Sequence, residues 1–588
     1  MNLFTDNRDL RFHLEESVRW ERFAPLWEDG FRHPDGPASL AEARELYLAG
    51  LAELGEYAAR EIAPRARAID EEGVGFADGG VVLPRGLLEN VAGLKRLGVM
   101  GLSLPREVGG QNFPFTAGAA AMEVLSRACT NTLLLYIFHQ APAAMVLRSG
   151  TPDQVERWVR PLAAGEISGA VAMTEPDAGS DVGNLSTVAE PEDGHWRLSG
   201  RKQFITNGGG DMCVVLARSE AGSRGLEGLS LFVAPRREAG RDNYRVARPE
   251  KKSVIRGSAT CELSFDRSCA ELLGARGSGF PQILTFMNEA RLAVAIQGLG
   301  ISQAALAAAQ AYAGRRVQMG RPIARHELVA DMLLDMEAEV AAMRALVYRC
   351  TQLQDRILGF ERGTRAAGGG GSAGPPAVRE LARLKRQLRD RTPLVKWFAS
   401  ERTLWVARTA VQVHGGYGVV QEYGVERHYR DALILPIYEG TSQIQALMSL
   451  KDQVRWALER PWRLLTGAVS VEAPPDTLGD ALREMAGEYH RALRYCIGEG
   501  LGVAGVLSAL RSREPDRARL GYALLHAERL CLMLAYTRAA EALASHAAAS
   551  PERRRLAERF VHRSLPLVRM HGEIVCSGDR STLEAIAG

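Results

Sequence analysis

The stretch of sequence that decides the fold runs Arg430-Asp-Ala-Leu-Ile-Leu-Pro-Ile-Tyr-Glu-Gly-Thr-Ser-Gln-Ile-Gln445. A lone carboxylate, Glu439, follows an apolar run there and sits against Gly440, Thr441 and Ser442. An apolar setting disfavours the charged form of a carboxylic acid, which suits a base for a weakly acidic proton. Gly440 removes side-chain bulk, and the hydroxyls behind it suit cofactor binding or helix capping. Taken alone, the pattern favours a buried structural carboxylate or an acid at a helix N-terminus over a catalytic base.

The composition is that of an ordinary soluble protein. The chain has 588 residues, 46% hydrophobic and 24% charged, and is too long for one compact core, so we expect three or four domains. A net charge of +3 argues for neither a nucleic-acid partner nor a strongly acidic one. The eight cysteines contain no C-x-x-C pair, which indicates neither a zinc site nor a disulfide framework, and we expect no metal.

The N-terminal residues 1–10 lack the basic and apolar regions of a signal peptide. No stretch approaches the roughly 20 apolar residues that span a bilayer. We therefore expect a cytoplasmic enzyme with reduced thiols and no membrane span.

Helical and strand-like patterns alternate along the chain. Apolar residues recur at helical spacing after residue 40, and again from Pro281. Between them, short apolar runs separated by Gly, Asp and Asn clusters are typical of a small antiparallel sheet. The predicted domains are an N-terminal arm (1–40), a helical domain (41–166), a β domain (167–275), a helical bundle (276–458) with a disordered low-complexity linker (362–378), and an extra helical domain (459–588).

Two further motifs fall in the predicted β domain. Residues 171–181 read VAMTEPDAGSD, a turn leaving a strand whose N–H groups and hydroxyls suit flavin and phosphate oxygens. A strand-ending turn with local caps is the other interpretation. Residues 200–208 read GRKQFITNG, in which alternation puts Phe204 and Thr206 on one face of a strand. A ring there suits stacking on a flavin beside a hydroxyl donor, although ordinary core packing fits the same alternation.

The predicted bundle carries three more segments of interest. Residues 287–291 read MNEAR at the start of a long helix, and the arginine suits either positioning of base or substrate or an interhelical ion pair. Residues 315–322 include an arginine whose fork suits a pyrophosphate. Residues 412–418 read QVHGGYG, which superficially suggests a dinucleotide loop but lacks the G-x-G-x-x-G spacing.

Taken together and in this order, these segments resemble the FAD-dependent acyl-CoA dehydrogenase family over roughly residues 45–455. The resemblance implies an α+β, mainly helical fold: an N-terminal helical domain, a middle antiparallel β domain and a C-terminal four-helix bundle. This chain adds an extra C-terminal helical domain. Its length is similar to that of the larger bacterial branch of the family that includes 3-(methylthio)propanoyl-CoA dehydrogenases.

The resemblance also implies roles for individual residues. The implied catalytic base is Glu439. The implied FAD contacts are Met173, Thr174, Phe204, Thr206, Arg316, Gln318, Gln412, Gly415, Gly416, Thr441 and Gln443. The implied substrate contacts are Ser180, Asn288, Arg291 and Gly440. The chain departs from the commoner family pattern at Phe204 (Trp), Asn288 (an acid) and Glu327 (Gln).

The implied reaction is α,β-dehydrogenation of an acyl-CoA thioester to the trans-2-enoyl-CoA. Glu439 takes the α proton, flavin N5 takes the β hydride, and electron-transfer flavoprotein takes the electrons. Because the segments around Arg316 and Gly415 reach a neighbouring subunit's cofactor in the family, a homodimer or higher homo-oligomer is implied.

Two alternatives stay open. One is an acyl-CoA oxidase that hands its electrons to oxygen. The other is a non-catalytic assembly factor or DNA-associated flavoprotein of the same fold, against which the intact Glu439 and the lack of a concentrated basic surface argue. A Ser/His hydrolase is poorly supported because no G-x-S-x-G elbow is present. Nothing in the sequence determines the length of the acyl chain.

Overall fold

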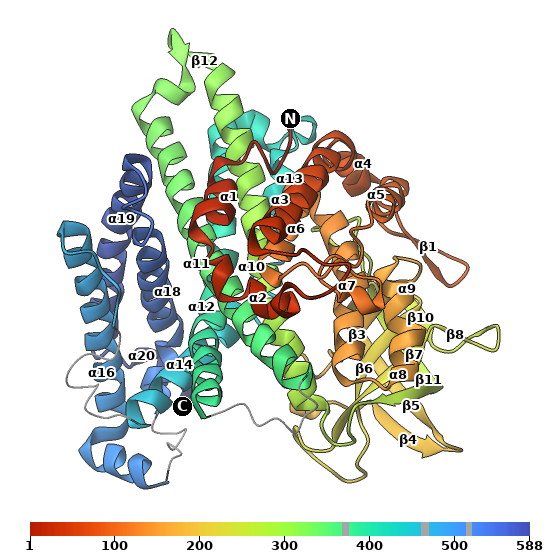
Figure 1. Cartoon of the computed structure of the whole chain (residues 1–588). Coiled ribbons are helices and arrows are strands. Elements are labelled where there is room, and N and C mark those ends of the chain that lie inside the picture. The colour runs from red at the N-terminus through yellow and green to blue at the C-terminus, as the bar shows by residue number, and fades with distance from the viewer. Residues whose placement is uncertain (367–374, 460–469, 513–519, 588) are drawn as a thin grey trace. The chain divides into compact units, whose positions relative to one another are not determined.

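The computed structural model describes residues 1–366, 375–459, 470–512 and 520–587 (Figure 1). The chain forms two compact units. Unit 1 comprises residues 1–8 and 20–293, and unit 2 comprises residues 9–19 and 294–588. The division falls inside one long helix, α10 (Gly279–Arg315), so each unit contains part of it.

Unit 1 begins with helices that pack on one another through apolar faces. The side chain of Ser39 accepts a hydrogen bond from the Glu42 N–H and so caps the first long helix. Cys129, in extended backbone, separates two helices of the Ala-rich region. The helices are α2 (Ala24–Trp27), α3 (Leu40–Tyr57), α4 (Ala63–Glu72), α5 (Arg85–Arg96), α6 (Phe115–Ala128), α7 (Thr130–Ser149), α8 (Pro152–Gln154) and α9 (Arg160–Ala163).

A hairpin interrupts these helices and is not among the predicted elements. Strands β1 (Gly75–Ala77) and β2 (Gly80–Val82) pair antiparallel. The connecting residues Asp78 and Gly79 have φ of +52° and +72°. Asp-Gly is a favoured pair for such two-residue turns, because both positions need positive φ. The signal is therefore present in the sequence, but it lies within a region of helical spacing.

The sheet of unit 1 is mainly antiparallel. Its order is β10-β11-β5-β4-β6-β3, and β7 pairs with both β11 and β6. Strand β3 lies at the edge of the sheet and pairs in parallel with β6. The turn that follows β3 is hydrogen-bonded to β5. The strands are β3 (Gly169–Ala172), β4 (Val188–Glu192), β5 (His195–Thr206), β6 (Met212–Arg218), β7 (Leu229–Pro235), β10 (Arg245–Pro249) and β11 (Thr260–Leu273), with a small hairpin of β8 (Arg237–Glu238) and β9 (Arg241–Asp242).

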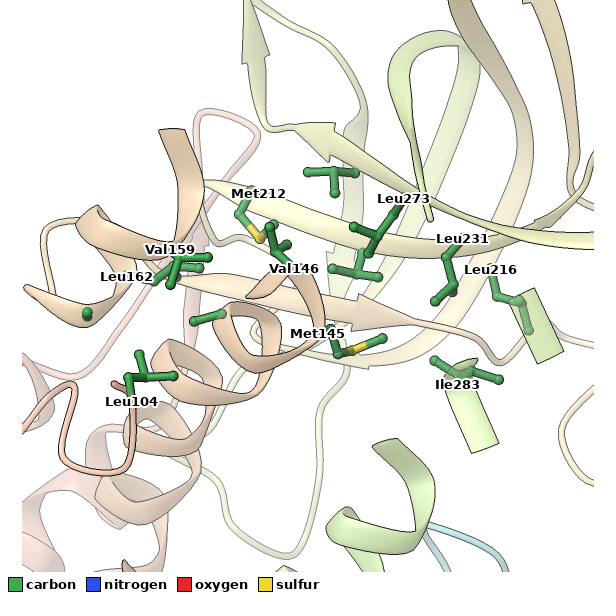
Figure 2. Close-up of a cluster of buried hydrophobic side chains, with 14 of the residues drawn as sticks. Leu104, Met145, Val146, Val159, Leu162, Met212, Leu216, Leu231, Leu273 and Ile283 are labelled. Atoms are coloured by element: carbon green, nitrogen blue, oxygen red, sulfur yellow. The ribbon is translucent and has the colours of Figure 1, made fainter. Parts of the chain in front are cut away.

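Helices and sheet of unit 1 share one apolar core, which Figure 2 shows. Met145 and Val146 of α7 and Leu162 of α9 pack against side chains from β6, β7 and β11. Fully burying a side chain of this size stabilises a fold by about 1.5–3 kcal/mol. This core fixes the end of β3, and with it the turn that carries the first sequence motif.

Unit 2 is a bundle of long helices. Its members after α10 are α11 (Glu327–Ala366), α12 (Pro375–His414), α13 (Val425–Ala432) and α14 (Ser442–Glu459). Helices α11 and α12 lie side by side, and α12 also contacts α13 and α14 (Figure 1). Ser302 of α10 donates a hydrogen bond to Thr403 of α12 at 3.0 Å.

Among the described residues, helix α10 is the one helix with a window long and apolar enough for a membrane span by length and composition alone, a stretch that is not expected from the sequence. That window is 72% buried inside the structure, as expected for a core helix of a bundle.

The C-terminal helices pack on the bundle through α11, α12 and α14. Arg559 of α19 pairs with Asp331 and Asp335 of α11, each at 2.6 Å. Asp9 of the N-terminal helix α1 (Arg8–Phe12) pairs with Arg344 of α11 and Arg553 of α19. The added helices are α16 (Thr477–Ser512), α17 (Gly521–Leu525), α18 (Ala527–Ala544), α19 (Pro551–Val575) and α20 (Ser581–Ala587).

The mainly helical α+β fold, with helices, sheet, bundle and extra helices in that order, is confirmed. The linker predicted at 362–378 lies partly outside the described residues. Residues 362–366 end α11 and residues 375–378 begin α12, whereas residues 367–374 are not described.

Candidate functional site

The turn after β3 carries Met173 and Thr174, two of the predicted cofactor contacts. The Thr174 carbonyl accepts a hydrogen bond from the Gln203 N–H at 2.9 Å, which joins this turn to β5. Lys202 of β5 donates to the Met173 carbonyl at 3.0 Å and to the Glu175 carboxylate at 2.8 Å. Both sequence motifs of the β domain therefore meet at one place.

Glu175 and Lys202 form a buried ion pair, with exposed side-chain fractions of 2% and 0%. Ser186 and Thr187 donate further hydrogen bonds to the Glu175 carboxylate. Burial would raise the pKa of Glu175, but the Lys202 ammonium and these donors outweigh it and lower the pKa to about 2. Burial lowers the pKa of Lys202 to about 8, against the opposing charge of Glu175. The sequence motifs contain both residues, but they do not indicate that the two side chains meet.

Strand β5 does not run unbroken past Phe204. Its pairing with β11 passes from Ile205–Cys261 to Lys202–Leu263, so β5 carries an extra residue and bulges. Phe204 has φ of +60°, and its side chain is 62% exposed. The bulge shifts the phase of the residues before it, and the placement of Phe204 and Thr206 on one face stays a prediction. An exposed aromatic ring at the bulge is available to stack on a planar partner.

Thr206 ends β5 and is half-buried. It lies beside Asn207, whose side-chain amide donates to the Gly169 carbonyl of β3 at 2.8 Å. Thr206 lines a very small cavity, about 10 Å³ in volume, together with Leu134 and Leu135 of α7. The hydroxyl is thus placed on a rigid support, next to the strand that leads into the Met173 turn.

The predicted substrate contacts of unit 1 fall on two segments. Ser180 is exposed in the loop that follows β3. Asn288 and Arg291 lie one turn apart on α10, and Arg291 donates to the Asn288 side-chain oxygen at 2.7 Å. Arg291 is only 2% exposed, so its hydrogen bond to Asn288 comes from a buried side chain.

Glu439 lies in a short turn between α13 and α14. Its φ is +56°, and Gly440 follows with φ of +88°. The left-handed region costs a non-glycine residue about 1–2 kcal/mol, and such strain persists only where the surroundings enforce it. The preceding residue, Tyr438, donates its hydroxyl to Gln297 of α10. Burial and the nearby Glu439 charge raise the pKa of Tyr438, so it stays a neutral donor.

Two buried side chains hold the carbonyl groups of this turn. Lys396 of α12 donates to the Gly440 carbonyl at 2.8 Å. Gln445 of α14 donates to the Glu439 and Gly440 carbonyls, each at 3.0 Å. Both side chains belong to residues with 0% exposure. Neither is among the predicted site residues, although Gln445 closes the stretch quoted first.

The predicted cofactor contacts Thr441 and Gln443 lie at the start of α14. The Thr441 hydroxyl accepts from the Ile444 N–H at 3.3 Å and thus caps the helix. Gln443 is exposed, and its amide nitrogen is 3.4 Å from a carboxylate oxygen of Glu528 on α18. Of the two interpretations of the hydroxyls, the structure shows helix capping directly for Thr441.

Five predicted cofactor contacts line one cavity of about 440 Å³ in unit 2. The Arg316 guanidinium lies 5.6 Å from the centroid of the Tyr417 ring, and Tyr312 stacks on His414 with centroids 4.3 Å apart. Gly415 has φ of +61°, and a Cβ added there would meet nothing within 4 Å. The predicted residues that meet here are Arg316, Gln318, Gln412, Gly415 and Gly416.

This cavity suits the phosphate and adenosine end of a dinucleotide. Arg316 supplies a charged fork for phosphate oxygens, and Gln318 and Gln412 supply amide donors and acceptors. The open space above the glycine turn lets a group approach the backbone closely. Among the residues that the structure describes, no group of three or more His, Cys, Asp or Glu is placed to hold a metal ion.

Comparisons with known proteins bear on the family of this chain. The chain matches the models of the acyl-CoA dehydrogenase N-terminal domain over residues 49–166, middle domain over 170–268, and C-terminal domain over 277–367 and 376–453. It is 32% identical to the 3-methylmercaptopropionyl-CoA dehydrogenase of Ruegeria pomeroyi, over 87% of this chain and 86% of that protein.

Two solved structures extend the comparison. One is described as the electron transferring flavoprotein of Acidaminococcus fermentans; it is 29% identical with a TM-score of 0.59, over 70% of this chain and 98% of that one. The other is an acyl-CoA dehydrogenase complexed with FAD from Bacillus anthracis, with a TM-score of 0.74 over 90% of this chain and 88% of that one. At 21% identity the latter shows likeness of fold, and this likeness extends into the added C-terminal helices.

Proposed function

Because this chain belongs to the acyl-CoA dehydrogenase family, we propose that it oxidises an acyl-CoA thioester to the trans-2-enoyl-CoA with Glu439 as the base. Membership of the family makes the protein an FAD-binding oxidoreductase that acts on acyl-CoA, as the sequence predicts. The residue roles, the electron acceptor and the assembly are our proposals.

The observation that carries the proposal is the backbone of Glu439. A base must lie within hydrogen-bond reach of the proton that it removes, so its side chain has to leave the backbone in one direction. The left-handed turn at φ of +56° sets that direction at a cost, which is expected where function requires it. A plain helix-capping acid needs no such turn, because capping is compatible with ordinary extended backbone.

The chain's own residues have separate tasks in this reaction. Glu439 takes the α proton, and the neutral Tyr438 hydroxyl, bonded to Gln297, anchors the residue before it. Ser180, Asn288, Arg291 and Gly440 are the proposed contacts to the acyl-CoA. The Glu439 turn is half-buried, so part of the water around the proposed base is excluded.

FAD, when bound, would supply the acceptor for the hydride that leaves the β carbon. The residues present fit such a group. In unit 1, the exposed ring of Phe204 is the stacking partner, and Met173, Thr174 and Thr206 are the polar and apolar contacts beside it. In unit 2, the cavity lined by Arg316, Gln318, Gln412, Gly415 and Gly416 suits the pyrophosphate and adenosine.

A homodimer or higher homo-oligomer is the assembly that we propose. Residues of the cavity in unit 2 serve a neighbouring subunit's cofactor in the family. Apolar side chains adjoining them in sequence are exposed, namely Val317 (53%), Met319 (93%) and Val419 (72%). Exposed apolar side chains gathered at one place suit a partner surface. Sedimentation at micromolar concentration measures the assembly, and a monomer that retains FAD would contradict it.

Electron-transfer flavoprotein is the proposed acceptor, and the cytoplasm the proposed location. The likeness to a structure described as an electron transferring flavoprotein supports this acceptor. An oxidase would instead turn over rapidly in air without an added acceptor. Comparing turnover in air with turnover in the presence of electron-transfer flavoprotein therefore separates the two reactions.

The decisive experiment is anaerobic bleaching of the bound flavin. We expect purified protein to be yellow and to bleach with at least one of butyryl-CoA, isobutyryl-CoA, phenylpropanoyl-CoA, palmitoyl-CoA and 3-methylmercaptopropionyl-CoA. Glu439→Gln should keep FAD but lose the bleaching. Bleaching of Glu439→Gln at the wild-type rate would show that the base is misassigned.

A further inference from the structure

The turn that carries Glu439 is held by side chains that no motif assigns to the site. We infer that Lys396 and Gln445 are positioning residues that aim the Glu439 carboxylate. This inference rests on the proposed role of Glu439 as the base. Both residues act through the backbone carbonyls of Glu439 and Gly440, at distances of 2.8 and 3.0 Å.

The carbonyl groups of Glu439 and Gly440 accept three hydrogen bonds from two buried side chains. Gln445 bridges the two carbonyl oxygens with one amide nitrogen, and Lys396 adds a second donor to the Gly440 oxygen. Any return of Glu439 to ordinary backbone geometry turns these carbonyls away from their donors. Buried polar groups without partners are costly, so the three bonds hold the left-handed turn in place.

The space around Gly440 is shaped by Gln445. A Cβ added at Gly440 would lie 2.7 Å from the Gln445 amide nitrogen and 3.3 Å from a methyl carbon of Ile444. The sequence predicts that Gly440 lets another group approach the backbone closely, and in the structure Gln445 is such a group. Gly440 and Gln445 therefore depend on each other, because the absence of a side chain at Gly440 leaves room for the Gln445 amide that bridges the two carbonyls.

Helix α12 supplies several of the contacts that hold the Glu439 turn. Lys396 and Ser400 lie one turn apart on it, and Ser400 donates to the Leu435 carbonyl at 3.1 Å. The next residue, Glu401, accepts from the Ser442 hydroxyl at 2.5 Å. The residues before and after Glu439 are thus hydrogen-bonded to one helix. The orientation of the Glu439 backbone is therefore fixed relative to α12 of the bundle.

The two positioning residues differ in the bonds that they donate, and this difference shapes the test. A hydrogen bond from an ammonium is stronger than one from a neutral amide. Lys396 holds only the Gly440 carbonyl, whereas Gln445 holds the carbonyls of both Glu439 and Gly440. Loss of either residue should therefore release the turn and misplace the base.

The experiment compares Lys396→Met and Gln445→Met with wild-type holoenzyme. The probe is whichever acyl-CoA of the panel bleaches the wild type fastest. We expect each variant to lower the bleaching rate at saturating acyl-CoA by on the order of 10²-fold, since a misplaced group loses about that much. Acyl-CoA affinity and FAD content should change less than about threefold, because neither residue is among the proposed contacts to these ligands.

Lys451→Met is the matched control, because Lys451 is an exposed lysine of α14. Equal bleaching rates in wild type and both variants would overturn the inference. Loss of rate in proportion to loss of FAD would also overturn it, since that is a merely structural effect. If Lys396→Met does not yield folded holoenzyme, Gln445→Met decides the question. A wild type that binds FAD but bleaches with no acyl-CoA overturns the proposed function and this inference with it.

Discussion

Phe204 in unit 1 and Glu439 in unit 2 share an unusual backbone conformation but are held in it by different chemistry. Their φ values are +60° and +56°, in a region that costs a non-glycine residue about 1–2 kcal/mol. Near Phe204, the buried ion pair of Lys202 and Glu175 joins the bulged strand to the Met173 turn. The Glu439 turn is held by hydrogen bonds to its carbonyls.

The contacts near Phe204 include a carboxylate, whereas the donors to the Glu439 turn do not, and this difference fits the charge of each side chain. A stacking ring carries no charge, so a complete ion pair beside it does not disturb its task. A carboxylate base is sensitive to a second carboxylate, because like charges disfavour ionisation. The donors at the Glu439 turn are a cation and a neutral amide. We therefore expect loss of charge and acid to lower the stability of the Phe204 region, and a change of packing at Gly440 to lower the stability of the Glu439 turn.

The largest effect expected is that of Lys202→Met in unit 1. This change leaves the Glu175 carboxylate buried without its ion-pair partner, which costs about 3–5 kcal/mol. The denaturant midpoint should fall strongly, and FAD should be retained less well because Lys202 also holds the Met173 carbonyl. Arg85→Met is the control, since it removes a solvent-exposed partner of Glu89 and should leave the midpoint unchanged. Equal midpoints for the two variants would contradict the role of the pair.

Acid should weaken the same pair. Glu175 has a pKa of about 2 against 4.5 for an ordinary glutamate, a difference worth about 3 kcal/mol. Because the pKa is lowered in the folded state, this stability is present above pH 4.5 and is lost as the pH falls towards 2. The gap in unfolding free energy between wild type and Glu175→Gln should therefore shrink over that range. Glu190→Gln, which changes an exposed acid of the same sheet, is the control; a gap independent of pH would contradict the assignment.

The sequence predicts the order of the domains and the identity of the motif residues, but not how these residues meet. Helical periodicity and short apolar runs are local, so they predict elements without their pairing. Arg316 and Gly415 lie far apart in the chain, and only the packing of the bundle brings them to one cavity. Their proposed contact with FAD came from resemblance to a family and stays a prediction.

The residues that sequence reasoning missed act through long-range contacts. Lys202 and Glu175 both stand inside quoted motifs, but the burial of Lys202, which requires an acid opposite, is seen only in the structure. The bulge at Phe204 depends on the register of β11, which local alternation does not contain. Lys396 precedes the Gly440 carbonyl that it binds by 44 residues, and nothing in its surroundings points to that carbonyl.

Substitutions at Gly440 and Gly415 of unit 2 distinguish the energetic cost of overpacking from the cost of backbone strain. Both have positive φ, so alanine at either position costs about 1 kcal/mol. At Gly440 the new Cβ would also meet the Gln445 amide at 2.7 Å, whereas at Gly415 it would meet nothing within 4 Å. We expect Gly440→Ala to lose about 2 kcal/mol of unfolding free energy and most of the bleaching rate, because overpacking adds to the strain. Gly415→Ala should lose about half as much stability. Equal losses would show that Gln445 moves aside.

The smallest effect concerns the strain at Phe204. Phe204→Ala and Phe204→Gly both remove the exposed ring, so both should retain FAD less well, as measured by flavin content after gel filtration. They differ in backbone cost, because glycine adopts a φ of +60° freely and alanine does not. The glycine variant should therefore be more stable than the alanine variant by about 1 kcal/mol in denaturant unfolding. Equal stability would mean that the bulge relaxes once the ring is gone, and the ring would then hold the backbone. Unchanged flavin content in both variants would remove Phe204 from the site and leave its strain without a functional reason.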